Sequence, residues 1–162
     1  PQPVTVSTPA GVSAPRMIMV NEVQPGLYAP LALRAGARQY VGAITGDGTA
    51  LVAPSAALPG GDARPARPGE TIVLFAIGAG PVTPHVEPGE VVPDLNALVT
   101  PVEVLFDGTP AKVEYAGLVP GYIGLYQINV VVPEVAAGEA VPLTIDLGGV
   151  RGTQTLYTAV GK

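Results

Sequence analysis

Residues 123–132, with the sequence IGLYQINVVV, decide the fold class because their apolar and polar side chains alternate. One side of the alternation carries two amides, Gln127 and Asn129. The other side is a row of large residues: Tyr126, Ile128, Val130 and Val132. Successive side chains of a β-strand point to opposite faces, so a period of two predicts a strand with one buried face. We expect the row to lie at the centre of the core.

Other segments of the same type surround this stretch. Residues 71–77 read TIVLFAI and are apolar on both faces, which predicts a central strand covered on both sides. We expect this strand to face the row across a sandwich, through Ile72 and Leu74 or through Val73 and Phe75. Further alternating runs occupy residues 101–106, 111–115, 141–147 and 153–160. Short strands separated by Gly- and Pro-rich turns predict an all-β protein, an antiparallel β-sandwich.

Asp107-Gly108 is the strongest short signal for a tight hairpin turn in the chain. If this loop has two residues, positions whose numbers sum to 215 face each other across the hairpin. Two facing pairs follow: Glu103 with Lys112 on the outer side, and Val104 with Ala111 on the inner side. Pro110 has no amide hydrogen, so a four-residue loop is the alternative.

Composition limits the functions that the chain can carry out. The 162 residues include 8 Lys and Arg against 13 Asp and Glu, a net charge of −5, which excludes a basic nucleic-acid groove. There is no cysteine, which excludes disulfides, thiolate zinc sites and cysteine nucleophiles. No run is apolar enough for membrane insertion. This composition fits an exported bacterial module, and the start at Pro1 indicates a piece of a longer polypeptide.

A weak internal repeat relates the two ends of the chain. Residues 3–7 (PVTVS) match residues 142–146 (PLTID). Two shorter matches accompany them: Gly11-Val12 with Gly149-Val150, and Ile18 with Leu156. The first match joins residues 139 positions apart and the other two join residues 138 positions apart, so a gap of one residue aligns all three. The repeat predicts that the N-terminus is the last hairpin of a preceding, similar unit.

The repeat also divides the chain into three parts. Residues 1–22 are expected to form a β-hairpin, residues 23–66 a connector with short strands, and residues 67–162 the sandwich. The stretch 54–68 is expected to be a Pro/Gly/Ala loop. A lone two-stranded hairpin is marginally stable in water, so it needs a partner surface. We expect it to dock on the sandwich of its own chain, and a dimer by strand exchange is the alternative.

Three motifs resemble the uncharacterised C-terminal domain family of the Solibacter type. The motifs are PGLY at residues 25–28, PARPGE at 65–70 followed by Leu74-Phe75-Ala76 and Gly80-Pro81, and YAGLVPGYIGLYQINV at 115–130. The resemblance covers residues 23–160, with Ile77 where Thr is usual and Ala79 where Leu is usual. It implies an immunoglobulin-like β-sandwich at the end of a large exported bacterial protein. It carries no established catalytic residues.

The candidate chemical groups favour a protein without catalysis, metal or cofactor. His85 is the only histidine and lies in a Pro-rich segment, which is typical of a solvated loop. The acidic residues fall mainly in turns or on outward strand faces, where they serve solubility. The turn at Asp47 has a single acid, and residues 87–94 have three without the tight alternation of a calcium loop. We therefore expect no enzyme, no metal site and no cofactor.

Five residues are the best candidates for a ligand surface: Tyr115, Tyr122, Gln127, Asn129 and Tyr157. Sugar sites combine flat aromatic faces with amide hydrogen bonds, although tyrosines also pack at the edges of cores. We predict a non-catalytic structural or adhesion module of a larger exported or cell-surface bacterial protein. Its expected partners are neighbouring domains of the same polypeptide, and a glycan or a surface protein. The alternative is an accessory carbohydrate-binding module of a secreted hydrolase.

Overall fold

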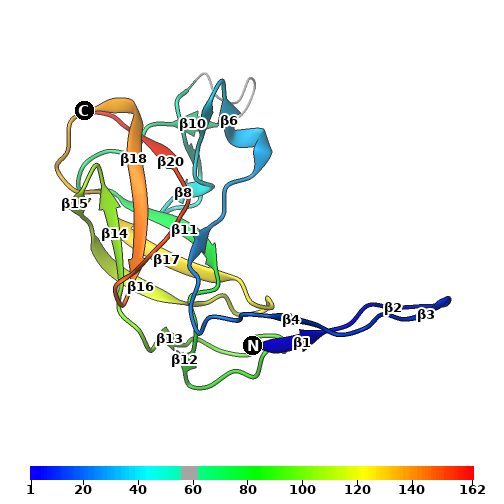
Figure 1. Ribbon diagram of the computed structural model, residues 1–162. Helices are drawn as coiled ribbons and strands as arrows, with labels where there is room; N and C mark the ends of the chain where they lie inside the picture. Colours follow the sequence, from blue (N-terminus) through cyan, green and yellow to red (C-terminus); the bar gives the residue numbers. More distant parts are fainter. Residues whose placement is uncertain (56–61) are drawn as a thin grey trace.

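The computed structural model describes residues 1–55 and 62–162, and this part of the chain is all-β, as predicted (Figure 1). Its one helical element is a short 3-10 turn, η1 (Leu31–Leu33). Two larger sheets face each other across one hydrophobic core, which is consistent with a β-sandwich. No helix among the described residues is long and apolar enough to cross a membrane. Residues 56–61 of the expected loop lie outside the described residues.

The larger sheet has seven strands in the order β10-β9-β8-β11-β17-β16, with β5 also paired to β11. The strands are β5 (Gly26–Leu27), β8 (Ala43–Thr45), β9 (Leu51–Val52), β10 (Ala63–Arg64), β11 (Thr71–Ile77), β16 (Lys112–Leu118) and β17 (Tyr126–Val131). The expected connector, residues 23–66, does contain short strands, and four of them belong to this sheet. The segment therefore builds the body of the molecule together with β11.

The smaller sheet has five strands in the order β15-β14-β18-β19, with β20 also paired to β18. They are β14 (Val102–Phe106), β15 (Thr109–Pro110), β18 (Gly138–Leu147), β19 (Val150–Arg151) and β20 (Leu156–Val160). Two short ribbons lie at the surface, β6 (Arg34–Ala35) with β7 (Arg38–Gln39) and β12 (Val82–Thr83) with β13 (Ala97–Leu98). An N-terminal hairpin pairs β1 (Gln2–Val4) with β4 (Arg16–Ile18) and β2 (Ser7–Thr8) with β3 (Gly11–Val12).

The predicted core row is confirmed, but its neighbours differ from the expectation. All four residues of the row, at positions 126, 128, 130 and 132, are buried. Ile72 and Leu74 do not face the row across a sandwich, because β11 pairs with β17 in the same sheet and Leu74 lies beside Ile128. The opposing layer of the core comes from the smaller sheet, through Val104, Phe106, Leu143, Ile145 and Leu147.

The Asp107-Gly108 turn has the predicted two-residue loop. Both residues have positive φ, 47° and 81°, as a tight hairpin turn requires. The facing pairs sum to 215: Phe106 with Thr109, and Leu105 with Pro110. The predicted pairing of Glu103 with Lys112 is wrong, because the chain crosses to the other sheet after residue 111. Lys112 opens β16 and pairs with Val131, while Glu103 pairs with Asp146.

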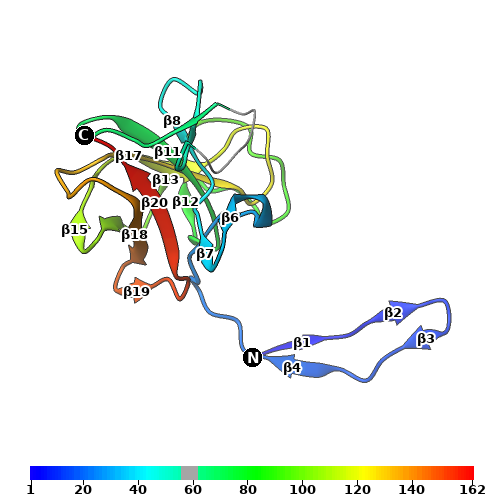
Figure 2. The same ribbon diagram turned by 90° about the horizontal axis from the view of Figure 1, so that it is seen from above.

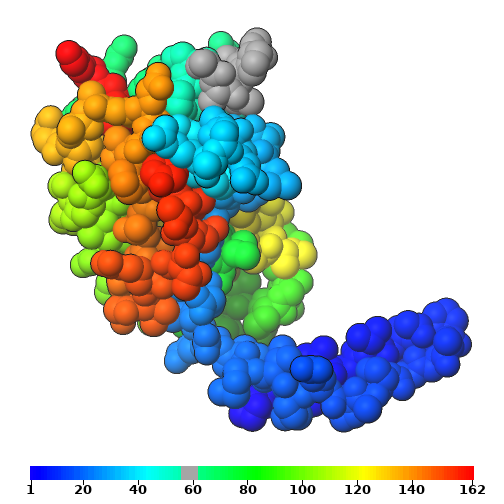
Figure 3. Space-filling view, turned by 45° about the horizontal axis from the view of Figure 1, so that its top comes forward, coloured from blue at the N-terminus to red at the C-terminus, as the bar shows by residue number. Residues whose placement is uncertain are grey.

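Residues 1–20, called the arm from here on, stand clear of the body (Figures 2 and 3). Every residue from 1 to 22 is exposed to solvent. The expected docking of this hairpin on its own sandwich is therefore wrong. The arm leaves seven large apolar side chains exposed: Val4, Val6, Val12, Met17, Ile18, Met19 and Val20.

Deletion of residues 1–22 is expected to leave the melting temperature of the body unchanged, to within about 2 °C. None of these residues contributes to the hydrophobic core, so their removal costs the body no buried apolar area. Differential scanning calorimetry of the full chain and of residues 23–162 checks this. A fall of several degrees would show that the arm supports the body in solution.

Candidate functional site

Three of the predicted ligand residues share the outer face of the larger sheet. Asn129 lies on β17 between Val73 of β11 and Tyr115 of β16, so their side chains share one face. Gln127 lies beside Phe75 on the same face. The Gln127 amide Nε2 donates a hydrogen bond to Asn129 Oδ1 at 2.8 Å, which holds the two amides together. The face thus presents polar amides next to aromatic rings.

An apolar groove of about 360 Å³ adjoins this face where β11 ends. It is lined by Tyr28, Phe75, Val119, Tyr122 and Leu125. Tyr28 and Tyr122 are 54% and 57% exposed, so solvent reaches both residues. The groove therefore brings the predicted Tyr122 close to the amide pair, since Phe75 contributes to both features.

Local hydrogen bonds place the two exposed tyrosines. The backbone N–H of Tyr28 donates to the Phe75 carbonyl at 2.7 Å, which extends the β5 pairing by one residue. A Cβ on Gly42 would lie 2.7 Å from the Tyr28 ring, so glycine is needed at that position for the ring to lie where it does. The 119–125 turn is closed by the Val119 N–H, which donates to the Leu125 carbonyl at 2.9 Å. These contacts fix the walls of the groove.

Tyr157 lies apart from this face, and Tyr115 has further contacts at its edge. Tyr157 lies on β20 in the smaller sheet, with its ring centre 6.4 Å from that of Tyr40 and 6.0 Å from the Arg38 guanidinium carbon. It is therefore not part of the same surface as Tyr122. The Tyr115 hydroxyl donates to the Leu118 carbonyl at 3.4 Å, and burial raises the pKa of Tyr115. Tyr115 is thus anchored at the edge of the face.

Sequence reasoning missed part of this groove. The sequence pattern places Tyr28 in a connector motif and Phe75 in a strand that is buried on both sides, so neither residue is predicted to line a groove. A signal for Phe75 is present in TIVLFAI, because the second apolar face of that strand needs a cover or a ligand. The contribution of Tyr28 depends on β5 pairing with β11, which no local pattern indicates.

A larger cavity, of about 510 Å³, lies between residues 21–24 and the 78–90 segment. His85 and Glu87 line it, and His85 Nε2 lies 3.3 Å from Glu87 Oε1. Both side chains are more than 60% exposed, as a solvated loop predicts. Within residues 1–55 and 62–162 no group of three or more His, Cys, Asp or Glu could hold a metal ion.

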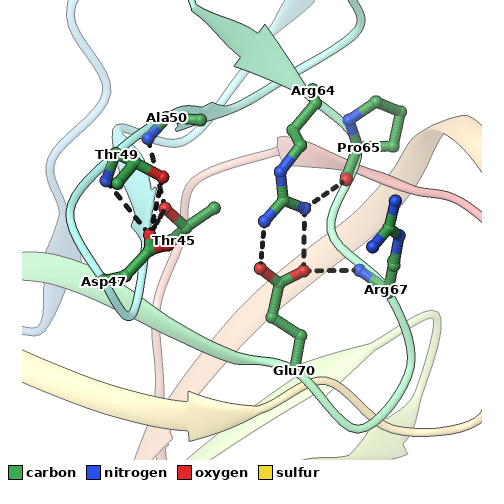
Figure 4. Close-up of polar contacts among 8 residues, drawn as sticks. All are labelled: Thr45, Asp47, Thr49, Ala50, Arg64, Pro65, Arg67 and Glu70. Atoms are coloured by element: carbon green, nitrogen blue, oxygen red, sulfur yellow. Dashed lines mark hydrogen bonds and ion pairs between the residues drawn. The ribbon is translucent and has the colours of Figure 1, made fainter.

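Two carboxyl groups with a lowered pKa, Asp47 and Glu70, lie near the start of β11 (Figure 4). Asp47 Oδ1 accepts hydrogen bonds from the Thr45 hydroxyl at 2.5 Å, and from the N–H and hydroxyl of Thr49 at 3.1 and 2.8 Å. Glu70 accepts from the Arg64 guanidinium and from the Arg67 N–H, and the Arg64 hydrogen bond lowers the pKa of Glu70. These contacts close turns and fasten β10 to the chain before β11.

The Asp47 carboxyl group is expected to titrate with a pKa of about 2, lowered from 3.8 chiefly by the Thr45 hydrogen bond. The contribution of this turn to stability is therefore complete above pH 4 or so and is lost as the pH falls through about 2. NMR titration of the carboxyl carbon checks the value. Thr45→Val should raise this pKa more than Thr49→Val, because Thr49 keeps its backbone hydrogen bond. An equal pKa in both variants would contradict this account.

The outer face and its groove are the best-formed candidate for a ligand surface in the part of the chain that the structure describes. Aromatic rings can stack on an apolar face of a ligand, while Gln127 and Asn129 can exchange hydrogen bonds with its polar groups. Comparison of the chain with models of protein families, with curated proteins and with solved structures finds no match.

Proposed function

We propose that the chain is a non-catalytic structural or adhesion module of a larger exported or cell-surface bacterial protein, built on an immunoglobulin-like sandwich. The arm is the observation that carries this proposal. It holds seven large apolar side chains in solvent on a hairpin that projects from the body. An exposed apolar surface of this kind marks an interaction site, because in isolation it would promote aggregation. The resemblance to domains at the ends of large exported proteins supports the same role.

The edge of the larger sheet at β16 is protected against pairing with a strand of another molecule. This protection favours association through the arm rather than through the body. The edge strand β16 is protected because the Asn96 side chain bonds both the N–H and the carbonyl of Leu118, as a further strand would. Lys112 and Glu114 add charges near the other end of the strand, and a register shift interrupts its pairing there. Charges and irregularities of this kind discourage strand addition at an edge. In the arm, Pro3 removes one backbone donor and Arg16 adds a single charge.

Surface display tests the proposal. The chain is placed behind a secretion signal and ahead of an anchored carrier in a bacterial host, and intact cells are treated with trypsin. We expect the body to reach the surface folded and resistant, and cleavage to occur first after Arg16, the only charged side chain of the arm. Intracellular degradation of the chain would overturn the exported role. Turnover of a chromogenic glycoside or ester by the purified chain would overturn the non-catalytic role.

The outer face supports a second candidate function, an accessory carbohydrate-binding module of a secreted hydrolase. The specific observation is the pairing of two exposed rings, Tyr28 and Tyr122, with the amides of Gln127 and Asn129 beside them. A glycan array probed with the purified chain tests it. Binding should be lost in Tyr122→Ala and retained in Tyr157→Ala, because Tyr157 lies on the other sheet. Absence of binding by the parent chain, or equal loss in both variants, would exclude this candidate.

A further inference from the structure

We propose that the Asp107-Gly108 turn is a site of isoaspartate formation, a covalent modification of the main chain that needs no enzyme and no cofactor. The chain has two Asp-Gly sequences, Asp47-Gly48 and Asp107-Gly108, and a threonine follows each of them. The fold holds the reacting groups of the first in hydrogen bonds and does not hold those of the second, so the modification should be confined to the second. The inference goes beyond the proposed function and does not rest on it.

The reaction closes a five-membered ring between the aspartate and the glycine. The glycine amide nitrogen loses its proton and attacks the side-chain carbon Cγ of the aspartate, and the carboxyl oxygen leaves as one molecule of water. Water then opens the succinimide ring. Attack at Cγ restores aspartate, whereas attack at the main-chain carbonyl carbon breaks its bond to nitrogen and leaves the glycine joined to Cγ, which is isoaspartate. One water is lost and one is gained, and glycine is the residue that hinders the attack least because it has no Cβ.

Hydrogen bonds hold both reacting groups of Asp47-Gly48. Asp47 Oδ1 accepts from the Thr45 hydroxyl and from the N–H and hydroxyl of Thr49 (Figure 4). The Gly48 N–H donates to the Thr45 carbonyl at 2.8 Å. This bond must break before the nitrogen can turn toward Cγ, and the carboxyl group must leave its three donors. The pKa of about 2 also keeps the Asp47 carboxyl group ionised at mildly acidic pH, and the ionised group is the poorer acceptor of a nucleophile.

The Asp107-Gly108 turn lacks these restraints. Both residues are exposed, and among the described residues neither the Asp107 carboxyl group nor the Gly108 N–H makes a hydrogen bond. The Asp107 N–H donates to the Pro142 carbonyl at 2.8 Å, but this nitrogen is not part of the ring that closes. A Cβ on Gly108 would meet no other atom within 4 Å, so there is space around the reacting nitrogen.

The modification would lengthen a two-residue turn. Isoaspartate routes the main chain through Cβ and Cγ, which adds one carbon atom to the path between Phe106 and Thr109. These two residues pair across the turn, and Phe106 is fully buried. Because the length of a hairpin loop fixes its register, the extra atom should disturb the pairing of β14 with β15. We therefore expect the modified chain to melt at a lower temperature than the unmodified chain.

Ageing of the 162-residue chain at mildly acidic pH tests the inference. Cleavage after glutamate places the two sites in different peptides, residues 23–70 and residues 104–114. Electron-transfer mass spectrometry locates isoaspartate in each peptide. Methylation by a protein isoaspartyl methyltransferase with labelled S-adenosylmethionine measures the total independently. The same chain aged in concentrated guanidinium chloride is the control, because unfolding removes the native hydrogen bonds from both sites.

We expect isoaspartate to accumulate at position 107 of the native chain at least about tenfold faster than at position 47, because native hydrogen bonds must break only at position 47. In guanidinium chloride the two rates should be similar, since both sites read Asp-Gly-Thr. A smaller ratio in the native chain would overturn the inference. A native rate at position 107 more than about tenfold below the rate in guanidinium chloride would also overturn it, because the turn itself would then protect Asp107.

Thr45→Val tests the same account at the protected site. It removes the hydroxyl that donates to Asp47 Oδ1 at 2.5 Å and keeps a side chain of similar size. Isoaspartate at position 47 should then form severalfold faster, while the rate at position 107 stays the same and shows that the variant is folded. Thr49→Val should have a smaller effect, because the Thr49 backbone N–H still donates to Asp47. An unchanged rate at position 47 in Thr45→Val would overturn the protective role of these hydrogen bonds.

Discussion

Ile128→Ala is expected to lower the free energy of unfolding by about 2–5 kcal/mol, the usual range for removing a large buried aliphatic side chain. Ile128 is fully buried on β17, in the central part of the larger sheet between β11 and β16. Its side chain belongs to the core cluster that includes the inward residues of the smaller sheet. Truncation would leave a cavity between the two sheets that neither can close without losing strand pairing. Denaturant unfolding followed by circular dichroism measures the loss.

Gln127→Ala is the matched control, one residue away on the same strand. Gln127 points to the half-exposed outer face, where its amide bonds only Asn129 among the described residues. We expect a loss of less than about 1 kcal/mol, as for most substitutions away from the core. Equal losses for the two variants would mean that both faces of β17 are buried in solution, which contradicts the two-layer arrangement.

Asn96→Ala is expected to destabilise the protein by about 2–4 kcal/mol, because it leaves buried backbone groups without partners. Asn96 Oδ1 accepts from the Leu118 N–H at 2.7 Å, and its Nδ2 donates to the Leu118 and Asp94 carbonyls, each at 3.1 Å. The side chain is 6% exposed, so water has little access to replace these bonds. Gly117 permits this close approach, since a Cβ there would contact the Asn96 backbone carbonyl and lie 2.6 Å from the Tyr115 hydroxyl.

Asn129→Ala removes an amide of the same size from the solvent face and is the control for Asn96→Ala. It should cost less than about 1 kcal/mol, since Gln127 can turn to water. Hydrogen exchange adds a local measurement: the Leu118 amide should exchange faster in Asn96→Ala and remain protected in Asn129→Ala. Unchanged protection of Leu118 in both variants would show that Asn96 does not close the edge of the sheet.

Local sequence patterns determined the strands and their buried faces. The alternation in residues 123–132 predicted which side chains of β17 enter the core, because side-chain direction in a strand has a period of two. Asp107-Gly108 predicted the two-residue turn, because both positions need positive φ. Gln127 and Asn129 share a face for the same local reason, whereas Tyr115 joins that face only through the pairing of β16 with β17, beyond a register shift.

The tertiary structure alone decided which strands are neighbours and which surfaces meet. Periodicity states which face of a strand is apolar but not which sheet the strand joins, so β11 was expected opposite β17 and lies beside it. The chain also changes sheets after the turn, which separates Glu103 from Lys112. Tyr28 and Tyr122 line one groove only because β5 pairs with β11, a contact between distant segments. The arm projects from the body, whose core is covered by β18 and β20, and that packing depends on the whole sheet rather than on any local pattern.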